Sequence, residues 1–198
     1  ARALRPQAQA RGSQAPQALG ITRNGGEEPC PMRILAIDPA IRNTGYAVVE
    51  GDHRRAHALD YGTLSIPRTV SQSGCLLAIK QHLGNLIDKW EPDEIAVERI
   101  IYVQSHQTAI TMGAAKAAVV IAAAEAGLRI MEYSPKSVKL SVVGRGGAQK
   151  AQVAFMVRAL LELRETPESD AADALAIGLT HLFAADPLKA HMIERKYI

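Results

Sequence analysis

Four acidic residues lie in segments of this chain that are otherwise as apolar as a protein core. Asp38 and Glu98 each end a short apolar run, and Asp170 and Asp173 stand three residues apart in a third apolar segment. Like charges brought together cannot all stay ionised without a compensating cation. A set of oxygen donors suits Mg²⁺ or Mn²⁺, and a pair of such ions can cut phosphodiesters. The four acids therefore predict a fold that gathers three distant segments around divalent metal.

Each acid also has a simpler structural interpretation. Asp38 and Glu98 fall at the carboxyl ends of expected strands, where each could merely end a strand or cap a turn. If the two strands are parallel neighbours, both acids emerge at the edge of the sheet where α/β proteins bind ligands. Asp170 could be a helix N-cap, but Asp173 lies inside the apolar run and shares a helix face with it. The combination favours a joint site over four separate structural roles.

A basic segment accompanies the acids. Residues 133–161 contain no acid, and the glycine-rich residues 144–147 precede a helix expected from about Ala148. Exposed backbone N–H groups at a helix N-terminus can bind an anion, although a run of bases can also be only a solvated helix face. Beside the acids, we expect the segment to bind phosphate. Its bases are Lys136, Lys139, Arg145, Lys150 and Arg158.

Hydrophobic periodicity predicts an α/β fold with a mixed five-stranded sheet and helices on both faces. The first three strands should form an antiparallel set, and the later strands should alternate with helices. The strands are expected at residues 33–38, 44–50, about 58–66, 95–98 and 128–133, and the helices at 76–90, about 104–126, 148–163 and 170–183.

One domain accounts for most of the 198 residues. Residues 1–31 are rich in Ala, Gln, Pro, Gly and Arg and show no apolar period, so a mis-assigned start, a disordered arm and a targeting peptide are all open. We favour the mis-assigned start and place the nuclease-like domain at residues 32–185, with a tail at 186–198.

Charge and cysteine content exclude several classes of protein. The net charge is only +3, so attraction to nucleic acid must come from a local patch. Two cysteines make neither a disulfide framework nor a zinc site. The longest uncharged apolar stretch, residues 117–124, is too short to span a bilayer. A soluble, cytoplasmic protein is the expectation.

Taken together, these motifs resemble the RuvC family, bacterial Holliday junction resolvases with an RNase H-like fold. The resemblance runs from Met32 to about Ala185, with the motifs in order and at suitable spacing. It rests on Ile37-Asp38-Pro39 with Thr44-Gly45-Tyr46, Ala96-Val97-Glu98, Val138-Lys139 with Val142-Val143-Gly144, Lys150 with Gln152-Val153 and Met156-Val157, and Asp170-Ala171-Ala172-Asp173-Ala174-Leu175-Ala176.

The resemblance implies a metal-dependent nuclease acting on a four-way DNA junction. It implies that the four acids bind two Mg²⁺ ions per subunit, for which Mn²⁺ can substitute, and that Lys139 and Lys150 contact DNA near the cut. It also implies a homodimer, since two symmetric nicks call for two related sites, and a RuvA–RuvB branch-migration complex as partner. The small-residue helix at 109–126 is the candidate dimer interface.

The chain departs from the family pattern after Glu98. Arg99-Ile100-Ile101 stands where the family usually has Gln-Val-Phe, so Tyr102 is the best candidate for a ring that stacks on a base. Three alternatives remain from the sequence alone: a YqgF-type nuclease acting on RNA, a module that binds junctions without cutting, and an actin-like ATPase. The last is weak because Ala40 replaces the glycine of its phosphate loop.

Overall fold

The computed structural model describes residues 31–101 and 105–198, and those residues form a sheet covered on both faces by helices. The strands are β1 (Met32–Asp38), β2 (Asn43–Gly51), β3 (Ala56–Ser65), β4 (Glu94–Glu98), β5 (Arg129–Tyr133) and β6 (Arg195–Tyr197). The helices are α1 (Gln72–Trp90), α2 (His106–Glu125), α3 (Pro135–Val143), α4 (Lys150–Leu160), α5 (Ser169–Phe183) and the short 3-10 helix η1 (Ala190–Met192).

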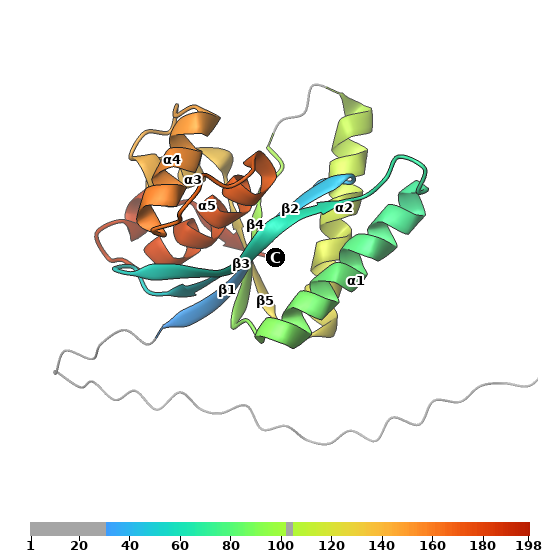
Figure 1. Ribbon diagram of the computed structural model, residues 1–198, viewed down its shortest axis with the longest axis horizontal. Coiled ribbons are helices and arrows are strands. Elements are labelled where there is room, and N and C mark those ends of the chain that lie inside the picture. The colour runs from blue at the N-terminus through green and yellow to red at the C-terminus, as the bar shows by residue number, and fades with distance from the viewer. Residues whose placement is uncertain (1–30, 102–104) are drawn as a thin grey trace, which may run out of the picture.

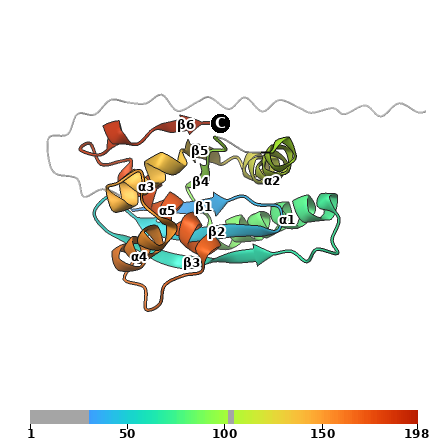
Figure 2. The same ribbon diagram turned by 90° about the horizontal axis from the view of Figure 1, so that it is seen from above.

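The sheet is mixed, with strand order β3-β2-β1-β4-β5-β6. The first three strands form an antiparallel meander, β1, β4 and β5 run parallel, and β6 returns antiparallel beside β5 (Figures 1 and 2). Ile37 of β1 lies opposite Val97 of β4. The residues that follow this pair therefore leave the sheet at the same edge.

Alternating side chains divide the interior into two cores. Ile34 and Ala36 of β1 face α3, α4 and α5, whereas Leu35 and Ile37 face α1 and α2. These side chains are fully buried because a central strand with helices on both faces has no solvated side. Figure 1 shows the two helical layers on opposite sides of the sheet.

The predicted α/β class is confirmed, but the sheet has six strands rather than five. The additional strand, β6, consists of three exposed residues, so no apolar alternation marked it in the sequence. Helix α3 was also missed, although Ser134 caps its start, Pro135 occupies its first turn and Gly144 ends it with a φ of 76°. Helix α4 begins at Lys150, two residues later than expected.

Helix α2 is long and apolar enough, by length and composition, to cross a membrane. One face of α2, including Ala115 and Val119, is buried in the core that the sheet shares with α1. The core helix of a folded domain passes the same test of length and composition. The other face leaves Ile110 and Ile121 largely exposed.

Candidate active site

Two of the four acids lie at neighbouring strand ends. Asp38 ends β1 and Glu98 ends β4, and the parallel pairing of these strands places the two residues beside each other. Because strand side chains alternate, Asp38 continues the row of Ala36 and Glu98 the row of Ala96, both of which belong to the core beneath α5. Both acids therefore point toward α5.

The other two acids stand on the first turns of α5, which approaches the sheet very closely. A Cβ atom at Gly45 would lie 2.1 Å from the carbonyl oxygen of Asp170. Gly45 is also opposite Asp38 in the β1–β2 register. Only glycine permits this approach, and it brings the start of α5, with Asp173, over the end of β1 and the start of β2.

A cavity of about 340 Å³ brings most of the predicted site residues together. The rest of its wall comes from the loop after β1 and from apolar side chains of α2, α3 and α4, among them Met112, which sequence reasoning did not single out. Asp170 is not part of the wall, although its charge acts on Asp38. The predicted residues that line the cavity are Asp38, Glu98, Lys139, Lys150 and Asp173.

Negative charge in the cavity is only partly compensated. Burial raises the pKa of Asp38 to about 6, and repulsion from Asp173 and Asp170 adds to the rise. Burial raises the pKa of Glu98 to about 7, with Asp38 and Asp173 contributing. Both carboxyls thus take up protons at a higher pH than free Asp or Glu, because burial and the neighbouring acids disfavour the charged form.

Lys150 supplies part of the missing charge. Its Nζ lies 2.7 Å from Oδ2 of Asp173, and this hydrogen bond raises the pKa of the lysine. Lys150 also lowers the pKa values of Asp38 and Glu98, and Lys139 lowers that of Glu98. The two lysines therefore act on the same acids that the sequence grouped with them.

The donor set fits a hard divalent cation in chemistry, because carboxylates from β1, β4 and α5 share one cavity. In the described part of the chain, however, no three Asp, Glu, His or Cys side chains converge closely enough to hold one ion. Ligation by three of these acids therefore requires their side chains to rotate. The raised pKa values of Asp38 and Glu98 show that added positive charge would be favourable there.

Two further predicted contacts, Lys136 and Arg145, do not line this cavity. Lys136 and Arg145 are exposed on α3 and on the turn that follows it. The turn is more structured than a flexible phosphate loop: Gly144 caps α3, and a Cβ at Gly146 would touch the stem of Lys136 at 3.0 Å. Tyr102 lies outside the described residues.

A small structural device holds the loop after Asp38. The hydroxyl of Thr44 is completely buried and donates a hydrogen bond to the carbonyl of Ala40 at 2.6 Å. Thr44 and Gly45 were noted in the sequence only as part of a turn and a family motif. Their structural roles are to close that turn and to admit α5.

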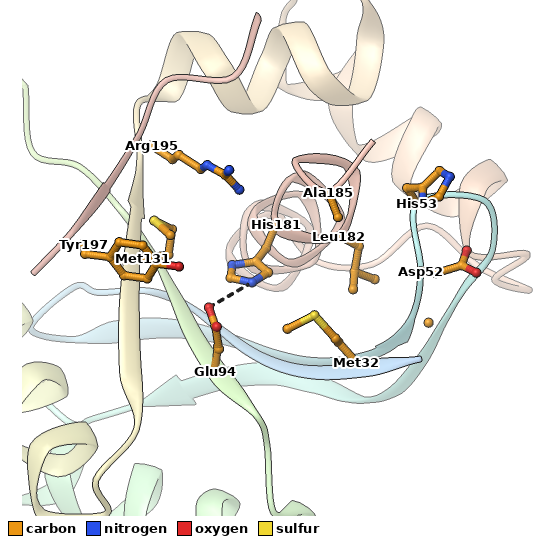
Figure 3. Close-up of a pocket in the computed structure, with 11 residues that line it drawn as sticks. Met32, Asp52, His53, Glu94, Met131, His181, Leu182, Ala185, Arg195 and Tyr197 are labelled. Carbon is orange, nitrogen blue, oxygen red and sulfur yellow. Dashed lines mark ion pairs between the residues drawn. The ribbon is translucent and has the colours of Figure 1, made fainter. Parts of the chain in front are cut away.

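A second cavity, of about 180 Å³, lies at the opposite end of β4 and is lined by Glu94 and His181 (Figure 3). His181 is buried, and burial lowers its pKa to about 4. Nδ1 of the ring and the hydroxyl of Tyr133 are hydrogen-bonded at 3.1 Å, and Nε2 lies 3.3 Å from Glu94. Arg129 completes the network at 2.5 Å from Glu94. Each of these polar groups thus has a hydrogen-bond or ion-pair partner within the network, which is typical of a structural polar network.

Comparison with known proteins places this geometry in a family. The sequence profile described as "Crossover junction endodeoxyribonuclease RuvC" matches residues 34–181. A relative of that name from Akkermansia muciniphila is 95% identical over 167 residues, which cover 84% of this chain and 100% of the relative. A second, from Halorhodospira halophila, is 43% identical over 149 residues, covering 75% of this chain and 89% of the relative.

Solved structures agree with the sequence matches. Thermus thermophilus RuvC in complex with a Holliday junction substrate superposes with a TM-score of 0.77 at 32% identity, covering 83% of this chain and 99% of that one. The yeast mitochondrial Holliday junction resolvase Ydc2 has the same fold, with a TM-score of 0.60 at 17% identity, covering 81% of this chain and 82% of that one. The chain belongs to the RuvC family of crossover junction endodeoxyribonucleases.

Proposed function

We propose that this protein is a structure-selective endonuclease that resolves four-way (Holliday) DNA junctions by paired symmetric nicks, in homologous recombination and DNA repair. The observation that carries the proposal is the single cavity in which acids from β1, β4 and α5 meet Lys139 and Lys150. Membership of the RuvC family, and the likeness to a RuvC structure with a junction substrate, support it.

The proposed chemistry depends on divalent metal, as the family implies. Two Mg²⁺ ions per subunit would be held by the four acids, with Mn²⁺ able to substitute. When bound, such ions activate a water molecule and stabilise the leaving oxygen of a phosphodiester. The acids would hold the metal ions and orient them toward the DNA strand. The proposed cut leaves a 5′-phosphate and a 3′-hydroxyl. The four acids are Asp38, Glu98, Asp170 and Asp173.

The lysines of the cavity are proposed to hold the DNA backbone. Phosphate contacts position a protein on DNA without reading its sequence, which suits an enzyme that selects a junction by shape. The side chain of Lys150 is 71% exposed, so it can reach a phosphate while remaining beside Asp173. Lys136 and Arg145 would extend the contact along α3, and Tyr102 would stack on a base.

Paired nicks require two active sites, which we propose come from a homodimer. The exposed apolar side chains of Ile110 and Ile121 on α2 make this helix the proposed dimer interface. A two-fold axis relates the two sites in such a dimer, as the two-fold symmetry of a junction demands. A RuvA–RuvB complex is the proposed branch-migration partner.

We also propose that residues 32–185 are the cytoplasmic nuclease domain and that residues 1–31 lie outside it. The match of the family profile to residues 34–181 supports these limits. Residues 186–198 form the tail that follows these limits in sequence. Strand β6 of this tail pairs with β5 and so adds to the sheet of the domain.

The test is Asp173→Asn with a synthetic four-way junction in Mg²⁺. Junction binding should survive, because asparagine has nearly the same size and shape as aspartate, while the cleavage rate falls at least about 100-fold. Asp88→Asn, an exposed acid on α1, is the matched control and should cut normally. A linear duplex and an RNA–DNA hybrid are the comparison substrates.

Undiminished cutting by Asp173→Asn would overturn the assignment of the site. Preferential cutting of the RNA–DNA hybrid by the unaltered protein would overturn the junction substrate. Tight binding without cutting in either Mg²⁺ or Mn²⁺ would show that the protein is not a nuclease.

A further inference from the structure

Arg99, the residue directly after Glu98, is anchored on the opposite face of the sheet. Its backbone N–H donates to the carbonyl of Tyr133 at 2.8 Å, which extends the β4–β5 pairing by one residue. Its guanidinium lies on the α2 side, with Nε 3.6 Å from Glu132. Successive residues of an extended strand face opposite sides. An anchor on Arg99 therefore keeps Glu98 directed toward α5 and the cavity.

The anchor has two carboxylates. Glu132 of β5 is nearly buried and is shared between Arg99 and Lys116 of α2. The second carboxylate belongs to Glu194, whose Oε1 lies 2.5 Å from Nη1 of Arg99. Glu194 lies closer to the guanidinium than Glu132 does, at 2.5 Å against 3.6 Å. Glu132 also pairs with Lys116, whereas the ion pair of Glu194 is with Arg99.

Glu194 also touches the helix that carries a cavity lysine. The side chain of Ile193, the residue before it, is buried in the core beneath α3 and α5, which anchors the segment. The backbone N–H of Glu194 donates to Oγ of Ser137 at 3.2 Å. Ser137 lies in α3 two residues before Lys139, which lines the cavity. One residue of the C-terminal segment thus contacts the supports of both Glu98 and Lys139.

We propose that Arg99 and Glu194 are positioning residues, through which the C-terminal segment holds Glu98 and α3 in place around the cavity. The proposal rests on the proposed function for the roles of Glu98 and Lys139. The family profile ends at residue 181, so Glu194 lies beyond the matched region.

The test is Glu194→Ala, whose side chain is 68% exposed, so that the fold should tolerate its loss. The single-turnover cleavage rate of a four-way junction should fall about fivefold, the size expected from an exposed ion pair. Junction affinity measured in EDTA should stay within about twofold, since phosphate contacts dominate it. Without DNA or metal, NMR should show faster hydrogen exchange at the Arg99 amide. Glu194→Gln keeps a hydrogen-bond acceptor, so its cleavage rate should fall between those of the unaltered protein and Glu194→Ala.

Two further variants isolate the link. Asp88→Ala removes an exposed carboxylate from α1 and should leave the cleavage rate and the exchange rate unchanged. Arg99→Ala combined with Glu194→Ala should cut no more slowly than Arg99→Ala alone, because the two side chains act as one unit. Additive losses would overturn the link.

The outcomes separate this proposal from the proposed function. If the unaltered protein cuts no junction, the proposed function fails, and the exchange rate at Arg99 still decides whether Glu194 holds the strand end. If the unaltered protein cuts but Glu194→Ala matches it in rate, the positioning role is refuted. A lower rate with unchanged exchange at Arg99 also refutes the proposal, because the effect would not pass through the strand end.

Discussion

Gly45→Ala tests whether the close approach of α5 to β2 sets the geometry of the acids. The added Cβ would lie 2.1 Å from the carbonyl oxygen of Asp170 and 2.7 Å from its carbonyl carbon. Non-bonded carbon and oxygen atoms seldom approach within about 3.3 Å, so the start of α5 must move by about 1 Å. A misplacement of about 1 Å can cost about 100-fold in rate. Overpacking of this kind costs about 2 kcal/mol in the free energy of unfolding.

The assay pairs single-turnover junction cleavage with thermal unfolding. Gly45→Ala should lower the cleavage rate about 100-fold and Tm by about 4–8 °C, while junction binding in EDTA changes little. Gly84→Ala on α1 is the control, because an added Cβ there meets nothing within 4 Å. Cleavage at the normal rate despite the loss in Tm would show that the reaction does not depend on where α5 begins, which would refute the reasoning.

Three other predictions follow from the charges of the two cavities. Because the pKa values of Asp38 and Glu98 in the folded protein, about 6 and about 7, lie above their ordinary values of 3.8 and 4.5, metal-free protein should lose stability as pH rises from about 4 to about 7. Calorimetry in EDTA checks this, and Mg²⁺ should raise Tm more at pH 8 than at pH 5. An equally large loss of stability with rising pH in the double variant Asp38→Asn, Glu98→Gln would contradict the prediction. Lys150→Gln removes a charge that lowers both pKa values, so the acid limb of the pH–cleavage profile should move to higher pH; a shift to lower pH would count against the assignment. Glu94→Gln should lower the free energy of unfolding by about 1–3 kcal/mol in urea titrations but leave the cleavage rate unchanged, because Glu94 lies at the far end of β4; a slow but fully stable variant would contradict this.

The same charges explain why a site of this kind lowers the free energy of unfolding of the metal-free protein. Asp38 and Glu98 follow strand residues that are buried in the cores, so each carboxylate is taken partly out of water and stands near another. Desolvation and repulsion both disfavour the charged forms. A divalent cation relieves both effects, and Lys150 relieves part of them without one. The site thus stores in the unliganded protein an unfavourable charge arrangement that metal and phosphate binding can use.

Much of the fold was predictable because its signals are local. Buried strands β1 and β4 read as short apolar runs, and helices α1 and α5 as apolar periods of helical spacing. An acid at the end of such a run is visible without knowing what lies beside it. The proximity of Asp38 and Glu98 followed from a parallel pairing that the element order suggested, and β1 and β4 do pair in that way. The catalytic roles of these acids stay predictions.

The misses have physical causes of two kinds. Strand β6 is three exposed residues long and exists only because β5 offers an unpaired edge, so no local pattern could announce it. The signals of α3 were present, since Ser134 and Pro135 mark a helix start, but Gly144 was interpreted as part of a phosphate loop rather than as a helix end. A glycine after an apolar helical stretch serves either purpose, and the choice depends on what surrounds it.

Composition and periodicity along the chain were enough to establish an α/β domain whose acids lie at the ends of buried elements, since burial imprints its period on consecutive residues. They could not establish which elements touch. Gly45 meets Asp170, Lys150 pairs with Asp173, and Arg99 pairs with Glu194, 95 residues away, only because the chain crosses the sheet in one order and not another. Contacts between distant residues depend on that packing, and the packing is decided by the whole core at once.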